Sequence, residues 1–130
     1  MYFLKEQKVL KNLVMTKIKI YSGGKVMSKV INYAGEDFEK ETVAEGITLV
    51  DFAAVWCGPC QMLEPALEEL SKTASYKIVK VDVDQSSELA AKYKVRSVPM
   101  MIVFKDGEEM ERLLGFMTQD EISKKMKAYV

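Results

Sequence analysis

The sequence contains no histidine and only two cysteines. The absence of histidine removes the side chain that most often serves as a metal ligand and general base in proteins. Two cysteines are too few for the disulfide framework that usually stabilises a small secreted domain. Any covalent or acid–base chemistry in this chain must therefore use sulfur, carboxylate, amine or backbone groups.

The chain also has no excess of charge of either sign and no long apolar run. It holds 19 Lys and Arg residues and 19 Asp and Glu residues, so the overall charge does not point to nucleic acid as a partner. Its apolar runs are far shorter than the roughly 20 residues that span a membrane. The first residues lack a clean apolar stretch before a small-residue cleavage site and do not read as a signal peptide. We expect a monomeric cytoplasmic protein that binds neither nucleic acid nor membrane.

The length of 130 residues fits one domain, and a hydrophobic content of 48% is enough for one core. The first 27 residues differ from the rest, because they carry six lysines and a single acid, Glu6. A Ser-Gly-Gly sequence interrupts this pattern shortly before Met27. We interpret residues 1–27 as an N-terminal extension, either a disordered tail or a translated leader that precedes a natural start at Met27. Residues 28–130 are the expected folded domain.

Strand-like and helix-like segments alternate along this domain. We expect strands at 30–33, 47–53, 77–83, 100–104 and 109–114, and helices at 35–43, 59–72 and 86–93 and after Thr118. Helices between successive strands imply parallel pairing, whereas Asp106-Gly107 indicates an antiparallel hairpin. The pattern predicts an α/β fold with a central mixed sheet of about five strands and helices on both faces.

The chemical centre of the sequence is Trp56-Cys57-Gly58-Pro59-Cys60, between an apolar strand and a helix. Cys57 falls at the N-terminus of the expected helix, where unpaired N–H groups and the helix dipole stabilise a thiolate. Pro59 suits the first turn, because its missing N–H is not needed there. Cys60 follows Cys57 by three residues, so the two sulfurs lie on the same side of one turn and could form or break a small disulfide ring.

Three other interpretations of the cysteine pair remain open at this point. A structural zinc site needs four ligands, so zinc would require two chains to share their cysteines. An inert structural disulfide would add little stability, because it would close a very short loop. The chain could also be a redox-inert binding module that retains the motif without using it.

Residues 29–130 resemble the thioredoxin family along their whole length, and the Trp-Cys-Gly-Pro-Cys motif in its strand-to-helix context is specific to that family. The resemblance implies the thioredoxin fold, in which four helices flank a central mixed sheet. It also implies a thiol–disulfide oxidoreductase that reduces disulfides in substrate proteins, with Cys57 as nucleophile and Cys60 as resolving cysteine. The two cysteines would form the redox-active disulfide, with no metal and no bound cofactor.

The resemblance extends to two residues outside the motif. It implies that Asp51 accepts the proton of Cys60, directly or through water, and that Lys80 neighbours and modulates this acid. Burial in an apolar strand would raise the pKa of Asp51, because burial disfavours the charged form. From the residues alone, Asp51 could instead point to water at a strand end, and Lys80 could be an ordinary surface lysine.

The resemblance also implies a substrate-docking surface. The family carries a cis-proline before the strand at 100–104, so we expect Val98-Pro99 to be cis and the Val98 backbone to pair with an extended substrate. Local sequence alone favours a trans bond here, and Gly115 alone reads as an ordinary turn. The expected apolar rim around the cysteines consists of Trp56, Gly58, Pro59, Val98, Pro99 and Gly115.

The implied electron source is NADPH, through thioredoxin reductase. The implied substrates are disulfide-containing proteins such as ribonucleotide reductase, peroxiredoxin and methionine sulfoxide reductase. The Gly-Pro dipeptide between the cysteines resembles the reducing branch of the family, and an oxidase or isomerase is the alternative within the same chemistry. Ala53, Gln61 and Met100 depart from the commonest family pattern, which leaves the redox potential and the partner preference open.

Overall fold

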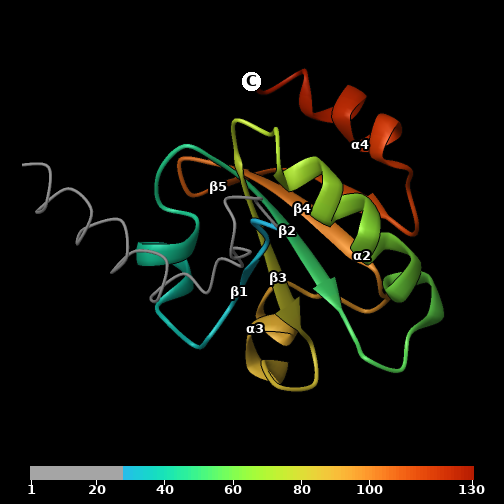
Figure 1. Cartoon of the computed structure of the whole chain (residues 1–130). Coiled ribbons are helices and arrows are strands. Elements are labelled where there is room, and N and C mark those ends of the chain that lie inside the picture. The colour runs from blue at the N-terminus through green and yellow to red at the C-terminus, as the bar shows by residue number, and fades with distance from the viewer. Residues whose placement is uncertain (1–27) are drawn as a thin grey trace, which may run out of the picture.

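The computed structural model describes residues 28–130, so the extension expected at residues 1–27 lies outside the described residues. The described chain alternates strands and helices in the expected order (Figure 1). The strands are β1 (Ile31–Asn32), β2 (Ile47–Ala53), β3 (Lys77–Asp82), β4 (Met100–Lys105) and β5 (Glu108–Leu114). The helices are η1 (Phe38–Thr42), α2 (Gly58–Ser71), α3 (Ser87–Lys92) and α4 (Gln119–Met126).

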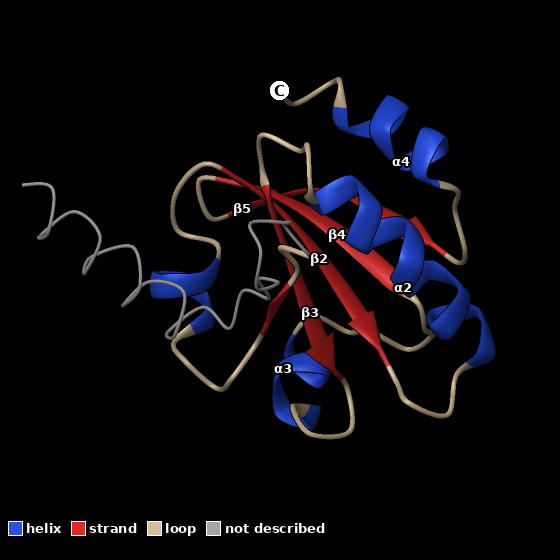
Figure 2. Ribbon diagram, viewed as in Figure 1, coloured by secondary structure: helices blue, strands red, loops and turns tan. Residues whose placement is uncertain are grey.

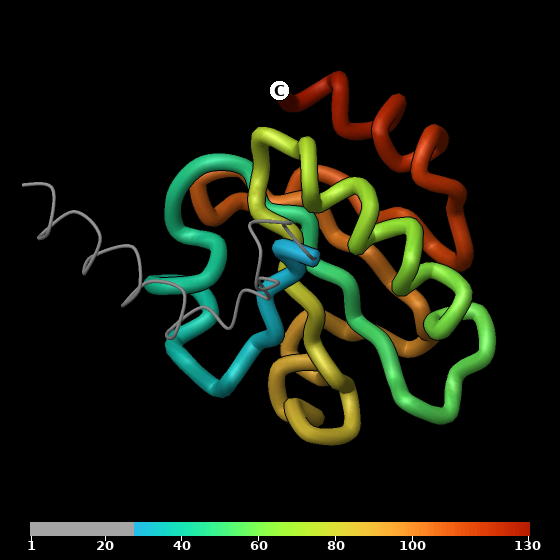
Figure 3. Tube along the Cα trace, in the orientation of Figure 1, coloured from blue at the N-terminus to red at the C-terminus, as the bar shows by residue number. Residues whose placement is uncertain are grey.

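The five strands form one mixed sheet in the order β1-β3-β2-β4-β5 (Figure 2). β3 pairs in parallel with both β1 and β2, whereas β4 runs antiparallel to β2 and to β5. The parallel β2–β3 pair follows from the crossover through α2, which Figure 3 traces along the chain. Asp106 and Gly107, with φ of 50° and 84°, form the two-residue hairpin loop between β4 and β5. The expected mixed α/β sheet is therefore confirmed.

Two elements near the start of the domain are shorter than expected. The helix expected at 35–43 is a five-residue π-helix, η1, and Asp37 caps it by accepting a hydrogen bond from the Lys40 N–H. Gly35 has φ of 94°, which a right-handed helix cannot include, and the Glu36 carboxylate accepts the Ala34 N–H. These local interactions delay the start of the helix. The strand expected at 30–33 is only the two-residue β1.

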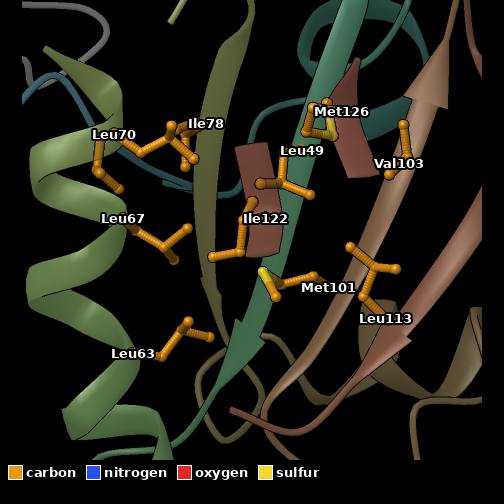
Figure 4. Close-up of a cluster of buried hydrophobic side chains, with 11 residues drawn as sticks. Leu49, Leu63, Leu67, Leu70, Ile78, Met101, Val103, Leu113, Ile122 and Met126 are labelled. Atoms are coloured by element: carbon orange, nitrogen blue, oxygen red, sulfur yellow. The ribbon is translucent and has the colours of Figure 1, made fainter. Parts of the chain in front are cut away.

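Helices cover both faces of the sheet and create two apolar clusters. On one face, α2 and α4 pack side by side, and the leucines of α2 point towards the sheet at helical spacing (Figure 4). This cluster includes Leu49, Leu63, Leu67, Leu70, Ile78, Met101, Val103, Leu113, Ile122 and Met126. On the other face, the buried Phe38 of η1 and the partly buried Leu89 of α3 pack against residues of the inner strands, including Phe52 and Phe104.

The alternation of side chains along β2 and β3 decides what lies beneath α2. Successive side chains of a strand point to opposite faces of the sheet. Leu49 belongs to the α2 face and Val50 to the opposite face, so Asp51 lies on the α2 face. By the same alternation Lys80 follows Ile78 onto this face, and Asp51 and Lys80 are paired in register. The fold thus places a carboxyl group and an amine under the helix that begins at the two cysteines.

Candidate active site

The two cysteines lie at the N-terminal end of α2. Cys57 is the N-cap residue, and its Sγ accepts a hydrogen bond from the Cys60 N–H at 3.1 Å. Gly58 and Pro59 form the start of the helix, and its first turn contains no acidic residue. Cys57 and Cys60 form a disulfide with their Cα atoms 5.2 Å apart. The sulfur of Cys57 therefore lies where backbone N–H groups and the helix dipole favour negative charge, so reduction of the disulfide can leave a stabilised thiolate.

An exposed apolar surface surrounds the nearly buried cysteines. Trp56 is 69% exposed, and its indole N–H donates to the Asp84 carboxylate at 2.9 Å, which fixes the orientation of the ring. Gly58 and Pro59 are exposed as well. Val55, which sequence reasoning did not single out, is 73% exposed, and its carbonyl accepts a hydrogen bond from the Gln61 side chain. Its signal in the sequence is adjacency, because Val55 directly precedes the Trp56 of the motif.

The loop before β4 adjoins this surface, with Val98 half-buried and Pro99 buried. The Val98-Pro99 peptide bond is cis, as the family resemblance implied. Val98 packs against the small cluster that contains Ala53, Ala54 and both cysteines. The Gly115 N–H, just after β5, donates to the Pro99 carbonyl at 2.9 Å. The fold thus brings the expected rim residues from three separate segments of the chain to the cysteine pair.

Asp51 is a buried acid beneath α2. It is 1% exposed, and within residues 28–130 neither carboxyl oxygen has a hydrogen-bond partner. Burial raises the pKa of Asp51 from its ordinary value of 3.8 to about 7, while the positive charge of Lys80 opposes this rise and the negative charge of Glu64 adds to it. The alternative in which Asp51 points to water at a strand end is therefore wrong. A carboxyl group with this pKa can accept and return protons near neutral pH.

Lys80 is Asp51's neighbour across the β2–β3 ladder, but its charged group is engaged elsewhere. The Lys80 Nζ forms an ion pair with Glu64 Oε1 of α2 at 3.3 Å. Sequence reasoning missed Glu64. Its signal is helical spacing, because it follows Cys60 by four residues and so lies one turn further along the same side of the helix.

Two cavities are lined by these groups. A small cavity of about 20 Å³ is lined by Asp51, Glu64, Lys80, Leu67 and neighbouring residues, and its volume is enough for about one water molecule. A more open pocket of about 290 Å³ is lined by Cys60, Gln61, Val55 and again by Glu64 and Lys80. The ion pair of Glu64 and Lys80 therefore forms part of both walls, between the buried acid and the pocket at Cys60.

Neither metal-binding clusters nor membrane-spanning helices occur in the described part of the chain. Among residues 28–130, no group of three or more His, Cys, Asp or Glu side chains is arranged to hold a metal ion. Over the same range, every helix is too short or too polar to cross a membrane.

Comparison with known proteins agrees with this geometry. Residues 29–128 match the thioredoxin family model. Thioredoxins from Staphylococcus epidermidis and Staphylococcus aureus are each 43% identical to the chain over 96 residues, which cover 72% of this chain and 91% of each relative.

Solved structures of thioredoxins are also similar to this chain. Thioredoxin NaTrxh from Nicotiana alata matches with a TM-score of 0.71 and 33% identity, over 83% of this chain and 98% of that one. A mutant thioredoxin from Halobacterium salinarum matches with a TM-score of 0.70 and 37% identity, over 75% and 88% of the two chains. The chain belongs to the thioredoxin family, and it is a thiol–disulfide oxidoreductase that reduces disulfides in proteins.

Proposed function

We propose that the reductase works by a two-step exchange in which Cys57 attacks the substrate and Cys60 resolves the intermediate. The Cys57 thiolate attacks one sulfur of a substrate disulfide, forms a mixed disulfide and releases the other substrate sulfur as a thiolate. Cys60, once deprotonated, attacks Cys57 Sγ and releases the second substrate thiol. The substrate gains two electrons, and the protein is left with the Cys57–Cys60 disulfide.

The observation that carries this assignment is the position of Cys57 at the N-cap of α2. Its sulfur already accepts the Cys60 N–H, and the adjoining Trp56, Gly58 and Pro59 are exposed. A thiolate in this position is stabilised by the helix and is close to a surface that a substrate can contact. Cys60 lies inside the first turn and lines the pocket that it shares with Glu64 and Lys80, so its position suits attack from within the protein.

Asp51 is the proton acceptor for Cys60 in this proposal, and Lys80 modulates it. A pKa of about 7 leaves the Asp51 carboxyl able to take up a proton when Cys60 attacks and to release it afterwards. The small cavity beside Asp51 has room for a water molecule that could carry the proton. Proton transfer then occurs directly or through that water.

The substrate docks on the apolar rim formed by the motif, the cis-proline loop and Gly115. An exposed apolar patch of this kind suits a protein partner. An extended segment of the substrate lies along the loop before β4 and pairs with the Val98 backbone, while the sulfur to be attacked lies over Cys57. Disulfide-containing proteins such as ribonucleotide reductase, peroxiredoxin and methionine sulfoxide reductase are the substrate class implied by the family.

Regeneration of the dithiol needs an external donor of two electrons. Thioredoxin reductase, supplied by NADPH, fills this role in our proposal. The cycle then runs in the reducing cytoplasm. Residues 28–130 are the catalytic domain, and the protein acts as a monomer. The absence of acidic residues from the first turn of α2 supports a pair that can cycle between thiolate and disulfide.

An insulin-reduction assay with thioredoxin reductase tests the whole cycle. With the wild-type protein, NADPH should be consumed and insulin should precipitate. Cys57→Ser and Cys60→Ser should each abolish turnover, whereas Met110→Ser, which replaces an exposed sulfur-containing side chain on β5, should leave it unchanged. Turnover that survives Cys57→Ser would overturn the assignment of the nucleophile. Absence of turnover in the wild-type protein would favour the redox-inert binding module.

A further inference from the structure

Three charged residues from neighbouring elements meet beneath α2, but only two of them form an ion pair. Asp51 of β2 and Lys80 of β3 are paired in register, while Lys80 Nζ lies 3.3 Å from Glu64 Oε1. Both oxygens of Asp51 lack a hydrogen-bond partner within residues 28–130. The lysine that lies beside the buried acid is therefore engaged by a second acid nearer the surface.

The Glu64–Lys80 pair is poorly suited to a role in stability. The side chains of Glu64 and Lys80 are 42% and 29% exposed. Ion pairs with this much contact with water contribute little to the free energy of unfolding. The position of the pair points to a role at the site instead, because both residues line the cavity at Asp51 and the pocket at Cys60.

We propose that Glu64 is a positioning residue of the reductase, which holds the Lys80 ammonium away from Asp51 and so keeps the buried acid able to exchange protons in the Cys60 step. The inference rests on the proposed role of Asp51 as proton acceptor. Without Glu64, the Lys80 side chain is free to turn towards the carboxylate of Asp51. A direct ion pair there would stabilise the charged form of Asp51 and weaken it as a base.

Among residues 28–130, the other groups around Asp51 do not provide an equivalent effect. Besides Glu64, α2 contributes Glu68 to the same cavity. It also contributes Cys60, which lines the neighbouring pocket and becomes titratable once the disulfide is reduced. From β4 and β1, Asp51 faces the uncharged Met101 and Asn32. Burial is the main reason for the raised pKa of Asp51, the charge of Lys80 lowers it, and the charge of Glu64 raises it directly. This direct effect of Glu64 is separate from its proposed hold on Lys80, and the test below distinguishes the two.

The test is a titration of the Asp51 carboxyl carbon by NMR in the oxidised full-length protein, in which neither cysteine titrates. Glu64→Gln should lower the pKa of Asp51 by about one pH unit, as expected when an opposite charge approaches a carboxylate. In a Lys80→Met background the same substitution should lower it by less than half as much, because no ammonium is left to move. Glu68→Gln is the matched control and should have a smaller effect than Glu64→Gln.

Two outcomes would overturn the proposal. Equal shifts from Glu64→Gln with and without Lys80 would mean that Glu64 acts only through its own charge. No shift in either background would mean that Glu64 does not influence Asp51 at all.

The pH profile of mixed-disulfide resolution separates this proposal from the proposed role of Asp51. Glu64→Gln should move the midpoint of that profile to lower pH, in step with the Asp51 titration. If Asp51→Asn leaves the profile unchanged, the acceptor role of Asp51 is wrong, while the NMR result still decides whether Glu64 positions Lys80.

Discussion

The buried carboxyl group of Asp51 makes a quantitative prediction about stability. Its pKa is about 7 in the folded protein, against an ordinary value of 3.8. The folded pKa is raised, so the unfolded chain ionises first as the pH rises, and the protein loses stability between these two values. The difference is about 3 pH units at about 1.4 kcal/mol each. Wild-type protein should therefore lose about 4 kcal/mol of unfolding free energy through this one group.

Asp51→Asn removes the ionisation and keeps the shape of the side chain. The stability of the variant relative to the wild type should rise by about 4 kcal/mol between about pH 4 and about pH 9. Urea unfolding of the oxidised proteins across this range measures the difference. Asp120→Asn, at an exposed carboxylate in the first turn of α4, is the control and should follow the wild-type profile. Parallel profiles for the wild type and Asp51→Asn would refute the claim that Asp51 ionises at a cost inside the protein.

Two further substitutions test the packing around the site by urea unfolding. Leu67→Ala should lower the free energy of unfolding by about 2–5 kcal/mol, because Leu67 is buried between α2 and the sheet and its truncation leaves a cavity. A loss below about 1 kcal/mol would contradict this, because it would mean that the surrounding side chains fill the cavity. Thr118→Ala should cost about 1 kcal/mol, since Thr118 and Glu121 form a capping box at the start of α4. An unchanged unfolding midpoint would contradict that role for the cap.

The features that the sequence predicted best are those that depend on local chemistry. The start of α2 follows from a cysteine N-cap and a proline in the first turn, and the β4–β5 hairpin follows from Asp106-Gly107. The position of Asp51 in an almost continuous apolar strand favoured its burial, although the strand alone also allowed the carboxylate to point to water. In each case the residues that decide the structure are neighbours in the chain.

Other features depend on contacts between distant segments. The Glu64–Lys80 ion pair joins α2 to β3, and neither residue's local sequence indicates the other. The cis bond at Pro99 was expected only through the family resemblance, because local sequence favours the trans form. η1 was misjudged because the positive φ of Gly35 and the side-chain bonds of Glu36 and Asp37 override the helical pattern there.

The most direct test of the account is to trap the intermediate with a disulfide-containing protein substrate. In Cys60→Ser, the reduced protein should form a mixed disulfide through Cys57 and be unable to resolve it, and peptide mass spectrometry of the covalent complex identifies the linked cysteine. A stable complex through Cys57 is expected with Cys60→Ser, and little or none with Cys57→Ser. A complex that forms through Cys60 in Cys57→Ser, with none in Cys60→Ser, would contradict the assignment of Cys57 as the attacking residue.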